Sequence, residues 1–144
     1  LLMKARKVFI DFFSRKLPIG IIHSDLFRDN VLADKNNITG IIDYYYSFTG
    51  PLIYELAVIV NDWCVNMDGT INKIKFEALL QSYSSIRKIS KSEIKQINNA
   101  MVAAALRFYL SRLSDMVFPK VGEITHIKDP YIFENILLQR LNKK

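Results

Sequence analysis

Five polar residues fall within or beside the apolar runs of one segment: His23, Asp25, Asp29, Asn30 and Asp43. Two carboxylates and a carboxamide that lie close together form an oxygen-rich site. Hard cations such as Mg²⁺ bind few protein oxygens and keep waters and substrate phosphates as their other ligands. Asn30 and Asp43 therefore suffice as protein ligands for magnesium, which leaves Asp25 free to orient a hydroxyl nucleophile.

Short strands must position these side chains. Apolar runs at residues 21–22, 31–33 and 40–46 predict three strands, and the polar stretch 34–37 predicts a tight turn between the last two. A hairpin at this turn returns the third strand toward the loop that precedes the second. We therefore expect Asp43 to lie close to Asp25 and Asn30.

Helices account for most of the remaining chain. Pro51 suits a first helical position. Ser90 and Glu93 form a capping-box pattern, Pro119 ends the helix that follows, and Asp129–Pro130 pairs an N-cap with proline at N1. These signals and the apolar spacing predict five helices: residues 2–13, from 51 to a stop at 66–69, 71–86, 90–117 and 130–141.

The order of these elements predicts the fold class. One helix, a small cluster of strands and four further helices indicate an α+β fold that is mostly helical, and 144 residues suit a single domain over 1–144. We expect Trp63 and the aromatic run Tyr44–Tyr46 to pack in the core. If the run is a strand, Tyr45 faces opposite to its neighbours. The inner face of the second helix is predicted to comprise Leu52, Leu56, Ile59, Val60 and Trp63.

Composition narrows the function classes. The 20 basic and 14 acidic residues give a net charge of +6, but the basic residues are spread along the chain. A nucleic-acid binder usually concentrates them on one face, so we expect no nucleic-acid partner. Cys64 is the single cysteine, which excludes an internal disulfide and fits a reducing, cytoplasmic compartment. Acidic residues interrupt every long apolar run, so we expect no membrane span.

The run from His23 to Asp43 resembles the protein-kinase signature, in which His-x-Asp is followed five residues later by Asn and then by a metal-binding Asp. Tyr44–Tyr45 stands where Phe-Gly usually follows that Asp. Phe27 stands two residues after Asp25, where protein kinases commonly have Lys. These departures favour the aminoglycoside and choline phosphotransferase superfamily, which acts on small molecules.

Within that superfamily the chain resembles the bacterial homoserine kinases. The blocks that carry the resemblance are residues 23–32, 40–47, 54–57, 61–64, 105–113 and 126–130. It implies a kinase-like C-terminal lobe that transfers the ATP γ-phosphate to the hydroxyl of L-homoserine with Mg²⁺, giving O-phospho-L-homoserine for threonine biosynthesis. Asp25 would be the catalytic base, His23 would brace its loop, and Asn30 and Asp43 would bind the metal and nucleotide. Glu55 replaces the usual Asp, which puts one supporting hydrogen bond in question.

An amino-acid substrate needs an arginine for its carboxylate and an acidic residue for its ammonium group. The candidates are Arg28, Asp62, Arg107 and Arg112. Arg28 could equally form a local ion pair with its neighbour Asp29. Arg107 and Arg112 lie five residues apart on one predicted helix and point in different directions, so we do not expect both to line the pocket.

Such kinases also carry a strand-rich N-terminal lobe with a glycine-rich loop and a lysine that hold the ATP phosphates. The five glycines here, at 20, 40, 50, 69 and 122, are far apart. We therefore expect that lobe to lie outside these residues, which leaves open a separate chain as its source. Two alternatives stay open: a kinase of the same superfamily for choline, aminoglycosides or methylthioribose, and an inactive remnant or assembly module. His126 is expected to stabilise a turn near Asp129.

Overall fold

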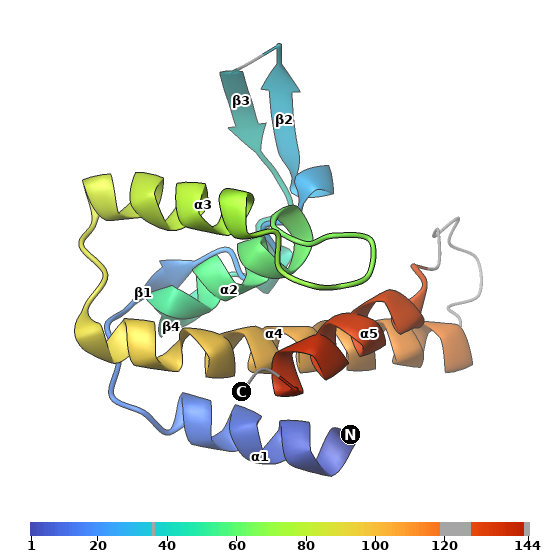
Figure 1. The fold of residues 1–144 in the computed structure, drawn as a ribbon. Helices are drawn as coiled ribbons and strands as arrows, with labels where there is room; N and C mark the ends of the chain where they lie inside the picture. The colour runs from blue at the N-terminus through green and yellow to red at the C-terminus, as the bar shows by residue number, and fades with distance from the viewer. Residues whose placement is uncertain (36, 119–127, 143–144) are drawn as a thin grey trace.

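The computed structural model describes residues 1–35, 37–118 and 128–142. Within them the chain forms five α-helices, four strands and two short 3-10 helices (Figure 1). The helices are α1 (Leu2–Phe13), α2 (Leu52–Trp63), α3 (Lys73–Ile86), α4 (Lys91–Val117) and α5 (Pro130–Leu141). The strands are β1 (Ile19–Ile22), β2 (Val31–Asp34), β3 (Asn37–Ile41) and β4 (Phe48–Pro51), and the 3-10 helices are η1 (Arg28–Asn30) and η2 (Tyr44–Tyr46).

Helix α4 is the centre of the molecule. It packs against α1, α2 and α5, which surround its middle part (Figure 1). Four alanines of α4 are fully buried there: Ala100, Ala103, Ala104 and Ala105. Because the separation of packed helices is set by the side chains at their contact, these small residues allow the neighbouring helices to approach closely.

Capping residues fix the starts of three helices. Ser90 and Glu93 form the predicted capping box at the start of α4. The Asp129 carboxylate accepts the Tyr131 N–H at the start of α5, and the Asn72 side chain accepts the Lys75 N–H at the start of α3. These side chains satisfy backbone donors that have no partner within the helix. The helix boundaries predicted from capping patterns at Ser90 and Asp129 are therefore confirmed.

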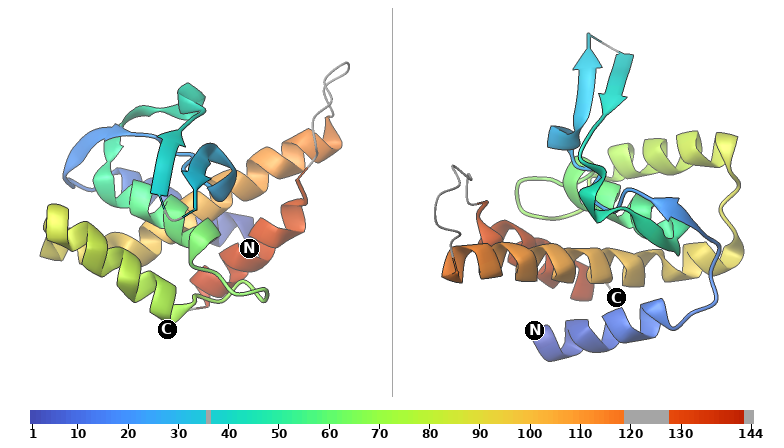
Figure 2. Two further views of the ribbon diagram at one scale, coloured as in Figure 1. Left: turned by 90° about the horizontal axis from the view of Figure 1, so that it is seen from above. Right: turned by 180° about the vertical axis from the view of Figure 1, so that it is seen from behind.

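The strands form two separate antiparallel pairs. β1 pairs with β4, from Ile19 opposite Pro51 to Ile22 opposite Phe48. β2 pairs with β3, and this hairpin projects away from the helices (Figure 2). The mostly helical α+β class is confirmed. β4 was not predicted, because its sequence Phe-Thr-Gly-Pro lacks an alternating apolar pattern.

The predicted strand over residues 40–46 is wrong in its second half. Strand β3 ends at Ile41, Asp43 adopts a left-handed backbone with φ 64°, and Tyr44–Tyr46 forms η2. The three tyrosines do not pack in the core, because their exposed fractions are 58%, 85% and 51%. A left-handed residue ends the extended conformation, so strand alternation does not apply beyond it.

Helix α2 is buried on more than one face. Leu56 and Val60 are buried as predicted, but so are Ile53, Ala57 and Val58. A helix with buried apolar residues on more than one face is enclosed by neighbours, in contrast to a surface helix with one apolar stripe. None of the helices in the described parts of the chain is both long and apolar enough to cross a membrane. Pro119, which was predicted to end a helix, and His126, which was predicted to stabilise a turn, lie outside the described residues.

Candidate active site

Ser24 is the most tightly held residue of the loop that carries Asp25. Its backbone is left-handed, with φ 62°, two residues after the end of strand β1. Its N–H donates to Glu55 Oε2 at 2.9 Å and its hydroxyl donates to the Tyr46 carbonyl at 2.6 Å. Arg107 Nη1 donates to its carbonyl at 2.5 Å. Glu55 thus accepts a hydrogen bond from this loop, so the supporting bond is kept although Glu55 replaces the usual Asp.

His23 uses both ring nitrogens within the protein. Nε2 lies 2.8 Å from the Ile42 carbonyl, and Nδ1 accepts the Asp25 N–H at 3.2 Å. These partners require a neutral ring with its proton on Nε2. The ring is buried and lies against Tyr44, with the ring centroids 4.6 Å apart. In this arrangement His23 braces the loop and presents no free nitrogen to a substrate.

Asn30 connects the Asp25 loop to the hairpin. Its Nδ2 donates to the Asp25 carbonyl at 2.8 Å and lies 3.5 Å from the Asp25 carboxylate. The Asn30 backbone carbonyl accepts the Ile42 N–H at 3.0 Å, so the end of the β2–β3 hairpin lies beside its start. Asp43 follows Ile42 directly. Its carboxylate is exposed and forms no hydrogen bond or ion pair with the described residues.

Asp25 is half-buried, and burial raises the pKa of its carboxyl group above the ordinary value. The positive charges of Arg107 and Lys128 oppose this shift, whereas the negative charges of Asp43 and Asp29 add to it. Both acidic residues therefore lie near enough to affect Asp25 electrostatically. A carboxyl group with a raised pKa is a better proton acceptor than an ordinary aspartate.

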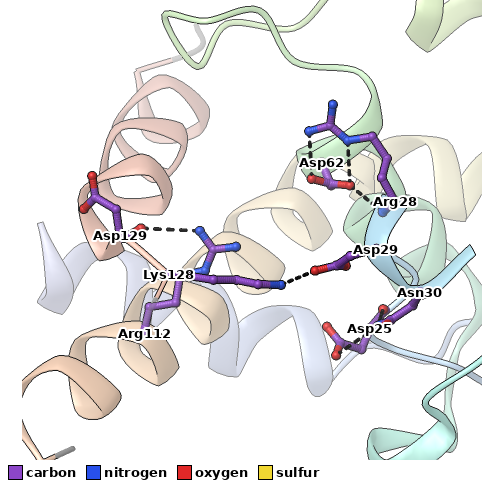
Figure 3. Close-up of polar contacts among 8 residues, drawn as sticks. All are labelled: Asp25, Arg28, Asp29, Asn30, Asp62, Arg112, Lys128 and Asp129. Atoms are coloured by element: carbon purple, nitrogen blue, oxygen red, sulfur yellow. Dashed lines mark hydrogen bonds and ion pairs between the residues drawn. The ribbon is translucent and has the colours of Figure 1, made fainter. Parts of the chain in front are cut away.

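Arg28 and Asp62, two substrate-binding candidates, bind each other (Figure 3). Arg28 Nε and Nη2 each donate to one Asp62 carboxylate oxygen at 3.1 Å, and the Arg28 N–H donates to the same carboxylate at 2.8 Å. The alternative pair between Arg28 and Asp29 is wrong, because Asp29 pairs with Lys128. The hydrogen bond raises the pKa of Arg28, and the pair ties η1 to the end of α2.

Arg107 and Arg112 of α4 contact different parts of the site. Arg107 supports the Asp25 loop through Ser24, and its guanidinium lies 5.0 Å from the centre of the Tyr46 ring. Arg112 donates to the Asp129 carbonyl at 3.4 Å, at the start of α5. Burial lowers the pKa of Arg112, although nearby aspartates partly compensate.

Lys128 is the site residue that sequence reasoning missed. It forms an ion pair with Asp29, and the two residues are 99 positions apart in the chain. Trp63 was also expected only in the core, yet its Nε1 donates to the Leu26 carbonyl at 3.1 Å and so supports the same loop. No local spacing could reveal either contact, although Lys128 does lie in one of the blocks that carried the family resemblance.

Comparison with known proteins shows the family. The model of the phosphotransferase enzyme family matches residues 2–89, which include His23, Asp25, Asn30 and Asp43. The chain belongs to the phosphotransferase enzyme family. This confirms the family-level prediction. Arg107, Arg112 and Lys128 lie beyond the matched residues, so their role in this phosphotransferase rests on their contacts alone.

Individual relatives are similar over most of the chain. A homoserine kinase of Methylobacillus flagellatus is 48% identical over 126 residues, which cover 88% of this chain and 40% of the relative. A homoserine kinase of Methylobacillus glycogenes is 44% identical, with the same coverage. A homoserine kinase of Neisseria meningitidis serogroup B is 43% identical, covering 89% of this chain and 42% of the relative. The phosphotransferase chain spans about two fifths of the length of these relatives.

Two side chains beside Asp25, those of Asn30 and Asp43, have oxygen atoms that could hold a divalent cation. Among the described residues, no three His, Cys, Asp or Glu side chains gather closely enough to hold a metal ion. Asn30 and Asp43 nevertheless offer an amide oxygen and a carboxylate at the same end of the hairpin. Because Mg²⁺ needs few protein ligands when it also binds substrate phosphates, this donor set fits magnesium and does not suit zinc.

Proposed function

We propose that this phosphotransferase chain forms the catalytic and acceptor-binding part of a homoserine kinase. The observation that carries the proposal is the Asp25 loop, which His23, Asn30 and the bonds to Ser24 hold in one conformation beside the exposed Asp43. The names of the relatives supply the acceptor, L-homoserine. The product would be O-phospho-L-homoserine, an intermediate for threonine biosynthesis.

The proposed reaction is an in-line phosphoryl transfer. Asp25 accepts a hydrogen bond from the homoserine hydroxyl and orients its oxygen toward the γ-phosphorus of ATP. A bond forms between that oxygen and phosphorus while the bond to the β,γ-bridging oxygen breaks. The hydroxyl proton passes to Asp25, and ADP leaves. Asn30 and Asp43 would hold Mg²⁺, which supplies charge stabilisation to the phosphate oxygens.

The other half of the nucleotide site would come from elsewhere. The 144 residues contain no glycine-rich loop, and phosphotransferases of this kind cover the ATP phosphates with such a loop and a strand lysine. We propose that polypeptide corresponding to the remaining length of the relatives supplies both, in the same chain or as a separate one. The isolated 144 residues would then bind the acceptor but transfer phosphate slowly or not at all.

A fusion protein tests the proposed function. The part of the Methylobacillus flagellatus relative that precedes the matched region is placed ahead of Leu1, and phosphorylation of homoserine, choline, an aminoglycoside and methylthioribose is measured. We expect transfer to L-homoserine, a loss of at least about a thousandfold in Asp25→Asn, and an unchanged rate in the control Asp34→Asn. Asp34 lies exposed on β2. The circular dichroism spectrum should be unaltered in both variants.

The outcomes separate the alternatives. Substantial activity in Asp25→Asn would contradict the assignment of the base. Phosphorylation of another alcohol but not homoserine would leave a small-molecule phosphotransferase with a different acceptor. A fusion protein that transfers phosphate to none of these acceptors, while the intact relative does so under the same conditions, would favour an inactive remnant.

A further inference from the structure

Two cations lie on an aromatic surface beside the Asp25 loop. The Arg112 guanidinium lies 4.4 Å from the centre of the Phe133 ring and 5.9 Å from that of Phe27. The Lys128 ammonium lies 5.7 Å from the centre of the same Phe27 ring. The two rings stack on each other, with centroids 5.7 Å apart. Helix α4 and the start of α5 thus bring two positive charges to one side of the catalytic loop (Figure 3).

These charges are only partly neutralised. Lys128 pairs with Asp29, and both side chains are about half exposed. Arg112 forms no ion pair with the described residues, and its guanidinium donates to the neutral Asp129 carbonyl. Nearby aspartates compensate the burial of this guanidinium only in part, because its pKa is still lowered, so an anion that approaches it would stabilise its charge further.

The other candidates for the substrate carboxylate are already engaged. Arg28 gives both arms of its guanidinium to Asp62 and anchors η1 to α2. Arg107 donates to the Ser24 carbonyl and stacks near Tyr46, so it holds the loop. A substrate that took either arginine would break a contact that positions the Asp25 loop.

The Lys128–Asp29 pair has the charges of a zwitterion. An amino acid carries a carboxylate and an ammonium group on one carbon, which match an ammonium and a carboxylate that face each other. An exposed ion pair between flexible side chains contributes little to stability, about 0.2–1 kcal/mol, so an incoming zwitterion can open it at low cost. Both residues affect the pKa of the Asp25 carboxyl group. They therefore lie near this carboxyl group and near the substrate hydroxyl that it would orient.

Resting on the proposed function, we propose that the Lys128–Asp29 ion pair opens to receive the zwitterionic head of the acceptor. Lys128 and Arg112 bind its carboxylate, and Asp29 binds its ammonium group. Arg28 and Asp62 are positioning residues that keep η1 in place. An acceptor that lacks the carboxylate or the ammonium group leaves Lys128 or Asp29 without a partner once their ion pair has opened. The site therefore selects amino acids over simple alcohols.

The test combines two variants with two acceptor analogues, each of which lacks one of the two charged groups. Binding of L-homoserine to the 144-residue chain is measured by calorimetry, together with L-homoserinol, which lacks the carboxylate, and 4-hydroxybutanoate, which lacks the ammonium group. Lys128→Met should weaken the binding of L-homoserine about tenfold or more and should not weaken that of L-homoserinol, because the change frees Asp29 for the ammonium group. Asp29→Asn should weaken the binding of L-homoserine similarly and should not weaken that of 4-hydroxybutanoate, because the change frees Lys128 for the carboxylate.

Controls separate recognition from folding. Lys91→Met removes an exposed lysine at the opposite end of α4, roughly 30 Å from Arg112 at 1.5 Å per residue, and should change no binding constant. Lys128→Arg keeps the charge and should retain most of the affinity. In the fusion protein, Lys128→Met should raise KM for homoserine with little change in kcat, since it removes binding and not chemistry.

Three results would overturn the proposal. These are unchanged L-homoserine binding in Lys128→Met, equal weakening of L-homoserine and L-homoserinol, and absence of saturable L-homoserine binding to the wild-type chain. If the fusion protein still phosphorylates homoserine in any of these cases, the proposed function stands and only the zwitterion site is rejected. If it phosphorylates another alcohol alone, the proposed function is rejected as well.

Discussion

Ser24 and Asp43 are the two residues of the site with a left-handed backbone, with φ values of 62° and 64°. Such a conformation is unfavourable by about 1–3 kcal/mol for a residue other than glycine, and it persists where the surroundings enforce it. At Ser24 the surroundings are Glu55, the Tyr46 carbonyl and Arg107. The direction of the Asp25 side chain thus depends on residues that hold the neighbouring Ser24 backbone and side chain.

Glu55→Ala tests this dependence. The change leaves the buried Ser24 N–H without its acceptor, and we expect the free energy of unfolding to fall by about 1–3 kcal/mol. Urea denaturation measures the effect. In the fusion protein kcat should fall more than KM rises, because the loop that aims Asp25 relaxes. Glu77→Ala, at an exposed position on α3, is the matched control and should change neither quantity by much. Equal effects of the two changes would rule out the role of Glu55.

Residue types named Arg107 as a candidate, but residue types and spacing predicted how the site residues group only where those residues are close in sequence. The set His23, Asp25, Asn30 and Asp43 lies within one hairpin, so its grouping follows from local geometry. Lys128 and Arg107 reach the same site from 99 and 83 positions away. Their direction is set by the packing of α4 and α5, which no periodicity specifies.

At the scale of elements, the start of α4 shows how one carboxylate can order a helix terminus. Glu93 is fully buried, and it accepts hydrogen bonds from the Ser90 N–H at 2.9 Å and from Arg87 Nη2 at 2.6 Å. Burial alone would raise the pKa of Glu93, but the bonds from Arg87 and Ser90 outweigh it and lower the pKa below the ordinary 4.5. The capping box therefore stabilises the fold more strongly while this group is ionised.

Glu93→Gln should show this as a pH dependence. A carboxyl group whose pKa is lower in the folded state adds stability above its unfolded pKa, and the fold loses that stability as pH falls through the folded pKa. We expect the variant to be less stable by about 2 kcal/mol at neutral pH, with a difference that shrinks below pH 4.5. Thermal unfolding of both proteins between pH 3 and pH 7 measures it. A difference that does not vary with pH would contradict the role of the charge.

Helices were predictable because caps and apolar spacing are local signals, and the strands were less so. Four helices have boundaries within two residues of the predictions, whereas η2 was mistaken for strand. The reason is Asp43, whose left-handed backbone ends the extended chain even though β-branched and aromatic residues continue on either side. Such a turn depends on what holds it, and here the neighbouring Ile42 is held by His23 and Asn30.

At the scale of the whole molecule, α5 closes the fold through a buried arginine. Arg140 is 2% exposed, and its Nε donates to Asn61 of α2 at 3.0 Å while Nη1 donates to the Gly69 carbonyl at 3.1 Å. Burial lowers the pKa of its guanidinium to about 10. Asn135 adds a bond to the Asp68 carbonyl at 2.8 Å, so α5 holds the loop that joins α2 to α3.

Substitutions at Arg140 separate packing from hydrogen bonding. Arg140→Ala removes the side-chain volume and both bonds, and we expect a loss of about 3 kcal/mol in the free energy of unfolding. Arg140→Met keeps most of the volume and removes a buried cation, so its loss should be less than half as large. Guanidinium denaturation compares them, with Arg6→Ala on the exposed side of α1 as control. A larger loss in Arg140→Met than in Arg140→Ala would show that packing is not the main contribution.

The bond from Arg107 to the Ser24 carbonyl has a consequence for the newly made chain. The two residues are 83 positions apart. A ribosome adds about 5–20 residues each second, so Arg107 emerges roughly 4 to 17 s after Ser24. During that interval the Ser24 carbonyl lacks the arginine that holds it in the finished protein. The Asp25 loop is therefore made early but gains its contact with Arg107 late, once α4 has left the ribosome.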